Sequence, residues 1–294
     1  MKTIHSTIWM LAIAASLPAS AANLMLNFRS TSTNAAASGD VTAAYQTLSP
    51  AHDDGSIPLA QTTWNNFSST ASSGSLNNAD GSAASGVTLT FGSERVANSG
   101  SIDYSYVTGI NISALYGNGG GTAGQQSLTG NSASIYGNGN NSSNSAAARA
   151  GWLGAANSAI GMRMDGLAAG DYRIYVMARN TNSNATTAAP MFLYASTGAS
   201  SSTFGFSSLT PTTEANTTYP NSNPTAYNAF DEGVNYVVIE VTVAAGQSLF
   251  LASDGAATGE TRGFLNMVQI VSIPETSVPL LAGLGLLALG RRRR

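Results

Sequence analysis

The sequence has no cysteine, and its only lysine is Lys2. Without cysteine there can be no disulfide and no thiolate metal site, so packing and backbone pairing must stabilise the fold. Between residues 22 and 273 there are seven arginines and 14 acids, a net charge of −7. This balance argues against nucleic acid as a partner, because binding to phosphates requires a surplus of basic residues.

Histidine is almost as scarce, with only His5 and His52 in the chain. A catalytic triad or a multi-histidine metal site therefore has too few residues, and no nucleophile elbow, Walker loop or zinc motif occurs. The segment Ala51–Gly55 places His52 before two aspartates and a glycine, a composition typical of an exposed turn. The sequence predicts no catalytic residue, no metal and no cofactor.

Acidic residues leave two alternatives open. A glycosidase needs two carboxylates brought together by folding, and the acids on or beside expected strands are Glu94, Asp103, Asp231 and Glu240. Oxygen ligands for calcium could also converge from glycine-containing turns, although no EF-hand spacing is present. The turn acids are Asp53, Asp54, Asp231, Glu232 and Asp254.

The N-terminus has the three parts of a secretory signal peptide. Lys2 gives a positive start, residues 8–17 form a short apolar core, and Pro18 precedes small residues. Ala19 and Ala21 fit the small-residue positions of a cleavage site. We therefore expect residues 1–21 to be a signal peptide and the chain to be exported.

The C-terminus combines an apolar run from Val278 to Gly290 with four arginines, Arg291, Arg292, Arg293 and Arg294. Arginines after an apolar segment act as a stop-transfer signal because they resist crossing the bilayer. The run has 13 residues, which as a helix span about 20 Å against a hydrocarbon core of about 30 Å. A short transmembrane helix that is recognised and then cut fits this length, and an unprocessed membrane anchor is the alternative.

This tail, residues 273–294, resembles the PEP-CTERM sorting signal of Gram-negative bacteria. The motif here is Pro274-Glu275-Thr276, followed by the apolar segment 278–290 and the arginine cluster. The third motif position departs from the usual proline. The resemblance implies recognition and cleavage by exosortase, an integral-membrane protease, after transient anchoring in the inner membrane. It also implies delivery to the cell surface or extracellular matrix.

Alternating apolar residues predict strands. Between Asn235 and Val243, four aliphatic residues share one face, while Tyr236, Glu240 and Thr242 share the other. Residues 247–252 alternate again after a glycine turn, so we expect a hairpin with the preceding strand. Residues 159–179 contain two further alternating segments around a turn at 166–170.

The whole pattern predicts an all-β domain over residues 22–272, a jelly-roll-like β-sandwich. Further expected strands are 24–28, 87–91, 102–107, 190–195 and 262–273. Long connections rich in serine, asparagine and glycine favour a sandwich over a meander barrel. The alternation around Asp171–Val176 resembles the galactose-binding-like jelly rolls of bacterial surface proteins.

A Tyr-Gly-Asn-Gly motif occurs twice, beginning at Tyr116 and Tyr136, within a Gly/Asn/Ser-rich insert near residues 117–148. Tyrosines in duplicated loops could bind sugar rings, while two strand ends entering glycine turns is the simpler interpretation. Trp64 and Trp152 are further candidate platforms, with core packing as their alternative role. Trp64, Tyr116 and Tyr136 form a hypothetical ligand platform.

These observations favour a non-enzymatic exported surface or matrix protein of a Gram-negative-type bacterium. The expected partners are exosortase during processing, the membrane through the C-terminal helix, and exopolysaccharide in a biofilm. Weak carbohydrate binding is the more specific form of this hypothesis. The alternatives are a polysaccharide hydrolase or lyase that uses two carboxylates, and an unprocessed, C-terminally anchored structural protein.

Overall fold

A computed structural model describes most of the expected domain. The described residues are 22–28, 49–71, 73–115, 151–179, 189–216 and 230–274. The signal peptide, the tail after Pro274, and both Tyr116 and Tyr136 lie outside these ranges. In the described part of the chain, no helix is both long and apolar enough to span a membrane.

The described residues are nearly all in strands and loops, as the alternation predicts. The strands are β1 (Asn23–Phe28), β2 (Asn65–Phe67), β3 (Thr88–Glu94), β4 (Ser101–Asp103), β5 (Ile110–Leu115), β6 (Gly151–Gly154), β7 (Ile160–Asp165), β8 (Gly170–Met177), β9 (Ala189–Gly198), β10 (Thr203–Gly205), β11 (Thr212–Asn216), β12 (Val237–Val243), β13 (Ser248–Asp254), β14 (Phe264–Leu265) and β15 (Met267–Ile273). The one helix within these ranges is α2 (Pro50–Asp53). The all-β expectation is confirmed.

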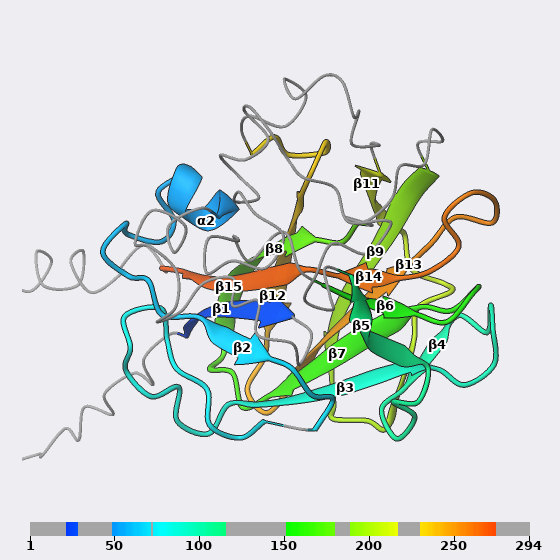
Figure 1. Cartoon of the computed structure of the whole chain (residues 1–294). Helices are drawn as coiled ribbons and strands as arrows, with labels where there is room; N and C mark the ends of the chain where they lie inside the picture. The colour runs from blue at the N-terminus through cyan, green and yellow to red at the C-terminus, as the bar shows by residue number, and fades with distance from the viewer. Residues whose placement is uncertain are drawn as a thin grey trace, which may run out of the picture.

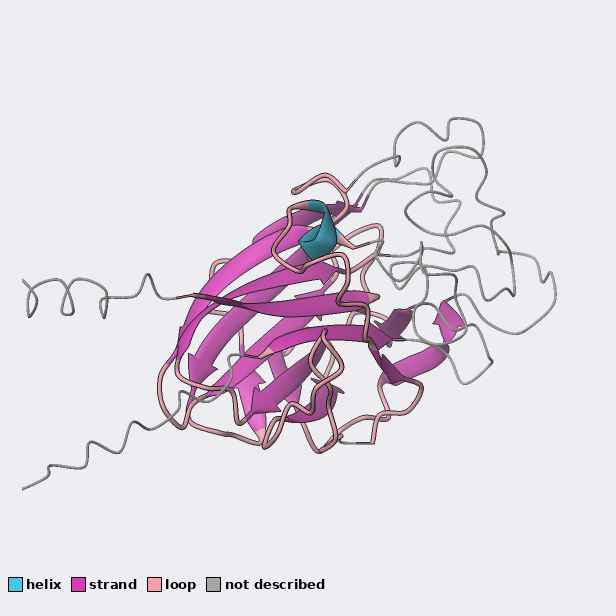
Figure 2. Cartoon of the chain, turned by 90° about the vertical axis from the view of Figure 1, so that its left-hand side faces the viewer, coloured by secondary structure: helices cyan, strands magenta, loops and turns pink. Residues whose placement is uncertain are grey.

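The strands form three sheets. A five-stranded sheet has the order β12-β8-β15-β1-β2, and a seven-stranded sheet has the order β10-β4-β3-β7-β13-β9-β11. A small third sheet contains β14-β6-β5. Figure 1 labels most of these strands, and Figure 2 shows them as stacked, curved layers with α2 at one end. The arrangement is a β-sandwich.

The main hydrophobic core lies between the two large sheets. Alternate residues of each strand point inward, including Leu24 and Leu26 of β1, Ile174 of β8, and Met162 and Leu251 from the opposite sheet. An aromatic cluster closes one part of this core. Its members, Phe28, Phe67, Phe91 and Trp152, have neighbouring ring centroids 4.8–5.8 Å apart.

The expected hairpin of residues 235–243 with 247–252 is wrong. β12 pairs with β8 in the five-stranded sheet, whereas β13 pairs with β7 and β9 in the other sheet. β13 is buried along nearly its whole length, and a buried strand needs a partner on each edge to satisfy its backbone. β12 keeps Glu240 and Thr242 exposed and therefore suits the sheet edge.

The outer face of the five-stranded sheet carries a second buried cluster. Met25, Tyr175 and Met267 of this face are covered by Trp64 and by Ala51 of α2. α2 is attached through Gln269 of β15, whose side-chain carbonyl accepts a hydrogen bond from the Ala51 N–H at 3.1 Å. The rim of this second cluster is where the polar residues described next converge.

Candidate functional site

The pairing of β8 with β12 creates a polar surface on the outer face of the five-stranded sheet. In the observed register Arg173 lies opposite Glu240, and Tyr175 lies opposite Val238. The Nε and Nη2 atoms of Arg173 both donate hydrogen bonds to Oε1 of Glu240, at 3.2 and 2.9 Å respectively. Because this pair is solvent-exposed, it contributes little to stability. The pair matters because both of its side chains line the cleft described below.

A tight turn before β12 brings Glu232 beside Tyr236. The N–H of Gly233 donates a hydrogen bond to the carbonyl of Tyr236 at 2.7 Å, and the backbones of Glu232 and Tyr236 form an isolated β-bridge. Gly233 has a φ of 76°, a left-handed conformation that glycine adopts without steric cost. Tyr236 and Glu240 both lie on the outer face because side chains alternate along the strand.

The third part of the site is Asp54, which follows α2. Its Oδ1 accepts from the N–H of Ser56 at 2.8 Å, and its Oδ2 accepts from the hydroxyl of Tyr175 at 2.5 Å. The Ser56 hydroxyl lies 2.7 Å from the same Tyr175 oxygen. Burial, followed by the bond to Asp54, raises the pKa of Tyr175, so its hydroxyl keeps the proton that it donates.

α2 is itself held by His52, and here the expectation of an exposed turn is wrong. His52 is only 4% exposed. Its Nε2 lies 2.8 Å from the carbonyl of Gln61 and therefore carries the proton, while Nδ1 accepts from the Ser49 hydroxyl at 2.6 Å. Ser49 in turn accepts from Nε2 of Gln269 at 2.8 Å. Burial lowers the pKa of His52, which keeps the ring neutral.

These segments enclose a cleft of about 400 Å³, which we call the acidic cleft. Its lining residues are Asp54, Arg173, Glu232, Tyr236, Val238 and Glu240. Three carboxylates therefore face one guanidinium. Tyr236 is 8% exposed, and desolvation together with the charges of Glu232 and Asp54 raises its pKa to about 12. The cleft thus offers several acceptors and a neutral hydroxyl.

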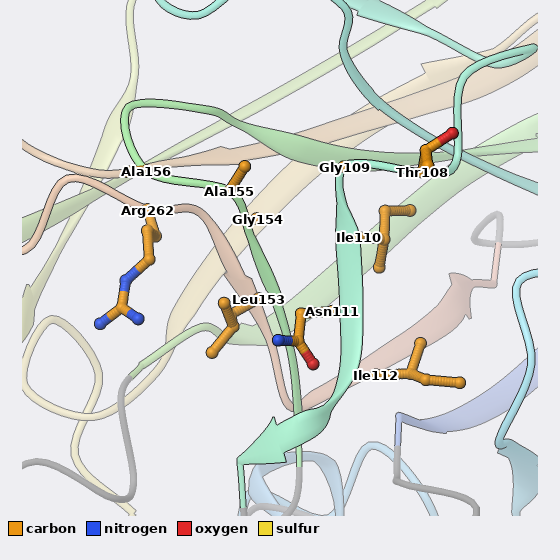
Figure 3. Close-up of a pocket in the computed structure, with 10 residues that line it drawn as sticks. All are labelled: Thr108, Gly109, Ile110, Asn111, Ile112, Leu153, Gly154, Ala155, Ala156 and Arg262. Carbon is orange, nitrogen blue, oxygen red and sulfur yellow. The ribbon is translucent and has the colours of Figure 1, made fainter.

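A second, more open pocket of about 590 Å³ lies beside β5 and β6 (Figure 3). Arg262 lines it, but its guanidinium is paired with Glu260 at 2.6 and 2.8 Å and lies 5.5 Å from the Phe264 ring centre. Leu153 lies opposite Asn111 in the strand register, and Figure 3 shows their side chains close together. The pocket is lined mainly by small and aliphatic residues with a neutralised cation, so the acidic cleft offers more binding chemistry.

The carboxylates proposed for a hydrolase separate into two groups. Glu94 and Asp103 belong to strands of the seven-stranded sheet, whereas Glu240 and Asp231 lie on and before β12. Asp103 is paired with Arg95 at 2.9 Å on the surface. The only one of the four that lines the acidic cleft is Glu240.

Glu94 is a buried structural acceptor, only 2% exposed. Its Oε1 accepts from the N–H of Gly100 at 2.5 Å, and its Oε2 accepts from the N–H of Ala159 at 2.9 Å. The Ser99 hydroxyl adds a third bond at 3.2 Å. Glu94 therefore joins the loop after β3 to Ala159, the residue just before β7.

Asp254, one of the proposed calcium ligands, lies at the end of β13. Desolvation and the nearby charge of Glu94 raise the pKa of Asp254 to about 6. Of the other turn acids, Asp54 and Glu232 line the acidic cleft. Within the described ranges, no group of three or more acidic, histidine or cysteine side chains is arranged to hold a metal ion.

Of the hypothetical ligand platform, the described ranges contain Trp64 alone. Trp64 is 4% exposed and packs in the second cluster with Ile57 and Met267, the core-packing role that was its alternative. Trp152 is likewise in the main core. Tyr116 and Tyr136 lie outside the described residues.

Sequence reasoning did not identify Arg173, Tyr175 and Tyr236 as site residues. The signal was present in part, because both segments alternate apolar residues with a second, more polar face. What the sequence did not contain was the pairing of β8 with β12, which joins residues more than sixty positions apart.

Comparison with known proteins gives little further guidance. No family model and no curated protein matches the chain. Among solved structures it is similar to part of a family GH115 4-O-methyl-α-glucuronidase with specificity for decorated arabinogalactans. That match has 11% identity and a TM-score of 0.28, and covers 43% of this chain and 15% of the enzyme. Likeness at this level says nothing about what the chain does.

Proposed function

We propose that the chain is an exported bacterial surface or matrix protein that binds glycan weakly. Export and sorting rest on the terminal segments: an apolar N-terminal signal, and the motif Pro274-Glu275-Thr276 followed by a short apolar run and four arginines. In this proposal the tail is a PEP-CTERM-type signal that anchors the chain transiently in the inner membrane until exosortase removes it.

Glycan binding rests on the acidic cleft. Its carboxylates, guanidinium and tyrosine hydroxyl can hydrogen-bond sugar hydroxyls, and its volume of about 400 Å³ fits the range of about 300–1,000 Å³ for small-molecule sites. The observed β-sandwich is compatible with a jelly roll, the finer architecture that we propose. In this form the domain would associate with exopolysaccharide in a biofilm.

We further propose that the domain binds glycan without turnover. Of the acids considered for a hydrolase, Asp103 and Glu240 are in surface ion pairs, and Glu94 is in a buried hydrogen-bond network. Incubating the purified protein with exopolysaccharide and measuring reducing ends tests this. Oligosaccharide release that disappears in Glu240→Ala or Asp103→Ala would identify a hydrolase instead.

Intact-mass analysis of the surface fraction tests sorting. Wild-type protein should lack Arg291–Arg294, whereas Glu275→Ala should accumulate as a heavier, membrane-retained species. Asp80→Ala, which removes an exposed acid from a distant turn, serves as the control and should be processed normally. A surface form that still carries the four arginines would overturn the sorting proposal.

A further inference from the structure

The acidic cleft has an excess of negative charge that the protein does not neutralise. Among its lining residues, the one cation is Arg173, and it is already paired with Glu240 at 2.9 Å. In the described part of the chain, no basic nitrogen lies within ion-pair distance of Asp54 or Glu232. Two carboxylates therefore face the cleft without a positive partner.

Tyr236 adds a hydroxyl group that can bond to a ligand in the cleft. The residue is more than nine-tenths buried and lines the cleft. Its hydroxyl has no hydrogen-bond partner among the residues that the structure describes, and it is not one of the fully buried polar atoms, so it opens into the cleft. Its ring is held between Tyr175 and Phe230, with ring centres 6.2 and 6.3 Å away.

The orientation of Asp54 is fixed before any ligand arrives. One oxygen accepts from a backbone N–H and the other from the Tyr175 hydroxyl, so the carboxylate cannot turn away from the cleft without breaking two bonds. Carboxylate oxygens each have a second acceptor site. Asp54 can therefore still accept a hydrogen bond from a ligand.

From these three observations we infer that the acidic cleft binds a cationic amino sugar, a hexosamine residue with a free amino group. This inference rests on the proposed glycan binding and specifies the class of glycan. The ammonium group would be attracted by Asp54 and Glu232, while ring hydroxyls would bond to Tyr236 and to the Arg173–Glu240 pair. An acidic polysaccharide would be repelled by the same carboxylates.

A calorimetric titration of the full-length protein tests the inference with three tetrasaccharides of one linkage: glucosamine, N-acetylglucosamine and glucose. At pH 6 and low salt, the glucosamine oligomer should bind roughly tenfold more tightly than the other two. Raising the salt concentration should reduce this preference, because added ions screen the attraction.

Three variants locate the interaction. Glu232→Gln should abolish the preference for the free amine, and Tyr236→Phe should weaken all binding about threefold to tenfold. Asp80→Asn removes an exposed charge outside the cleft and should change neither. An equal loss in Asp80→Asn would mean that diffuse charge attracts the oligomer, and the inference would be wrong.

The panel separates the two proposals. Equal binding of all three oligomers, or tighter binding of the acetylated or neutral one, would overturn the amino-sugar inference and leave glycan binding in place. Binding of none of the three, repeated with exopolysaccharide from a producing bacterium, would overturn glycan binding itself.

Discussion

The hydroxyl of Tyr175 on β8 donates a 2.5 Å hydrogen bond to Oδ2 of Asp54, 121 residues earlier in the chain. This bond joins the loop after α2 to β8, an interior strand of the five-stranded sheet. It also fixes one carboxylate of the acidic cleft. The Asp54 side chain therefore contributes both to stability and to the proposed ligand binding. Comparing variants of Tyr175 and of the neighbouring Tyr236 separates these two contributions.

Tyr175→Phe should lower the free energy of unfolding by about 1.5–3 kcal/mol, the usual contribution of a hydrogen bond to a charged group. Tyr236→Phe is the matched control, because its hydroxyl has no partner among the described residues, and it should change stability by less than about 0.5 kcal/mol. Denaturant unfolding of both variants measures the difference. Equal losses in the two variants would contradict the described hydrogen bonding.

His52 should make the protein less stable as the pH falls below about 6.5. Its pKa is lowered in the folded state, so the unfolded chain binds a proton at a higher pH than the folded chain does. Stability is therefore lost progressively as the pH falls from the unfolded pKa towards the folded one. His52→Gln should flatten the profile of unfolding free energy between pH 7 and 5. Superimposable profiles would show that His52 is not buried and neutral.

Asp254 should have the opposite effect: it should make the protein less stable as the pH rises. Its folded-state pKa of about 6 is above the usual aspartate pKa of 3.8, so its contribution to stability decreases as the pH rises from about 4 to 7. Asp254→Asn should raise the free energy of unfolding at pH 7 by roughly 1 kcal/mol, a value reduced because the carboxyl is partly solvated. Asp103→Asn is the control with the opposite sign, since hydrogen bonds from Ser105 lower the pKa of Asp103.

Glu94→Gln should destabilise the protein by about 2 kcal/mol. Both carboxylate oxygens accept from backbone N–H groups, so the amide nitrogen of glutamine would face one of these donors. The same change should lower the pKa of Asp254, because it removes a nearby negative charge. Thermal unfolding and an NMR titration of the Asp254 carboxyl measure the two effects. An unchanged Asp254 pKa would contradict the coupling.

Two of the turns that carry the chain between the large sheets should differ in their tolerance of alanine. Gly166 and Gly246 both have positive φ, 82° and 75°. A Cβ at Gly166 would lie 2.0 Å from the carbonyl oxygen of Gly86, whereas a Cβ at Gly246 meets nothing within 4 Å. Gly246→Ala should cost about 1 kcal/mol from backbone strain alone. Gly166→Ala should cost at least about 3 kcal/mol or prevent folding, and equal melting temperatures would contradict this difference.

Much of the strand content was predictable because side chains alternate with a period of two. The apolar faces of residues 160–164 and 237–243 point into the core as predicted, and the mixed faces lie outside. This regularity is local, so it can be read without knowing which strands are neighbours. The pairing partners of β12 and β13 depend on which of the two strands is buried on both faces. This burial is set by the arrangement of all the strands in the sandwich, which no single segment of sequence contains.

The site was less predictable for the same reason. Sequence analysis identified Asp54, Glu232 and Glu240 as acids of interest, but not that they would share a cleft with Arg173. The burial of His52 depends on Ser49, Gln61 and Gln269, and the last of these is more than two hundred residues away. Local composition does not report such contacts, so a histidine beside two aspartates and a glycine predicts a surface turn.

The position of β15 sets the order in which the domain can assemble. This last described strand lies between β8 and β1, and Asn23 of β1 accepts hydrogen bonds from the backbone and hydroxyl of Ser272. The five-stranded sheet is therefore split until its final residues arrive. If the chain is exported N-terminus first, as proposed above, this sheet can close only after residues 267–273 have crossed the membrane.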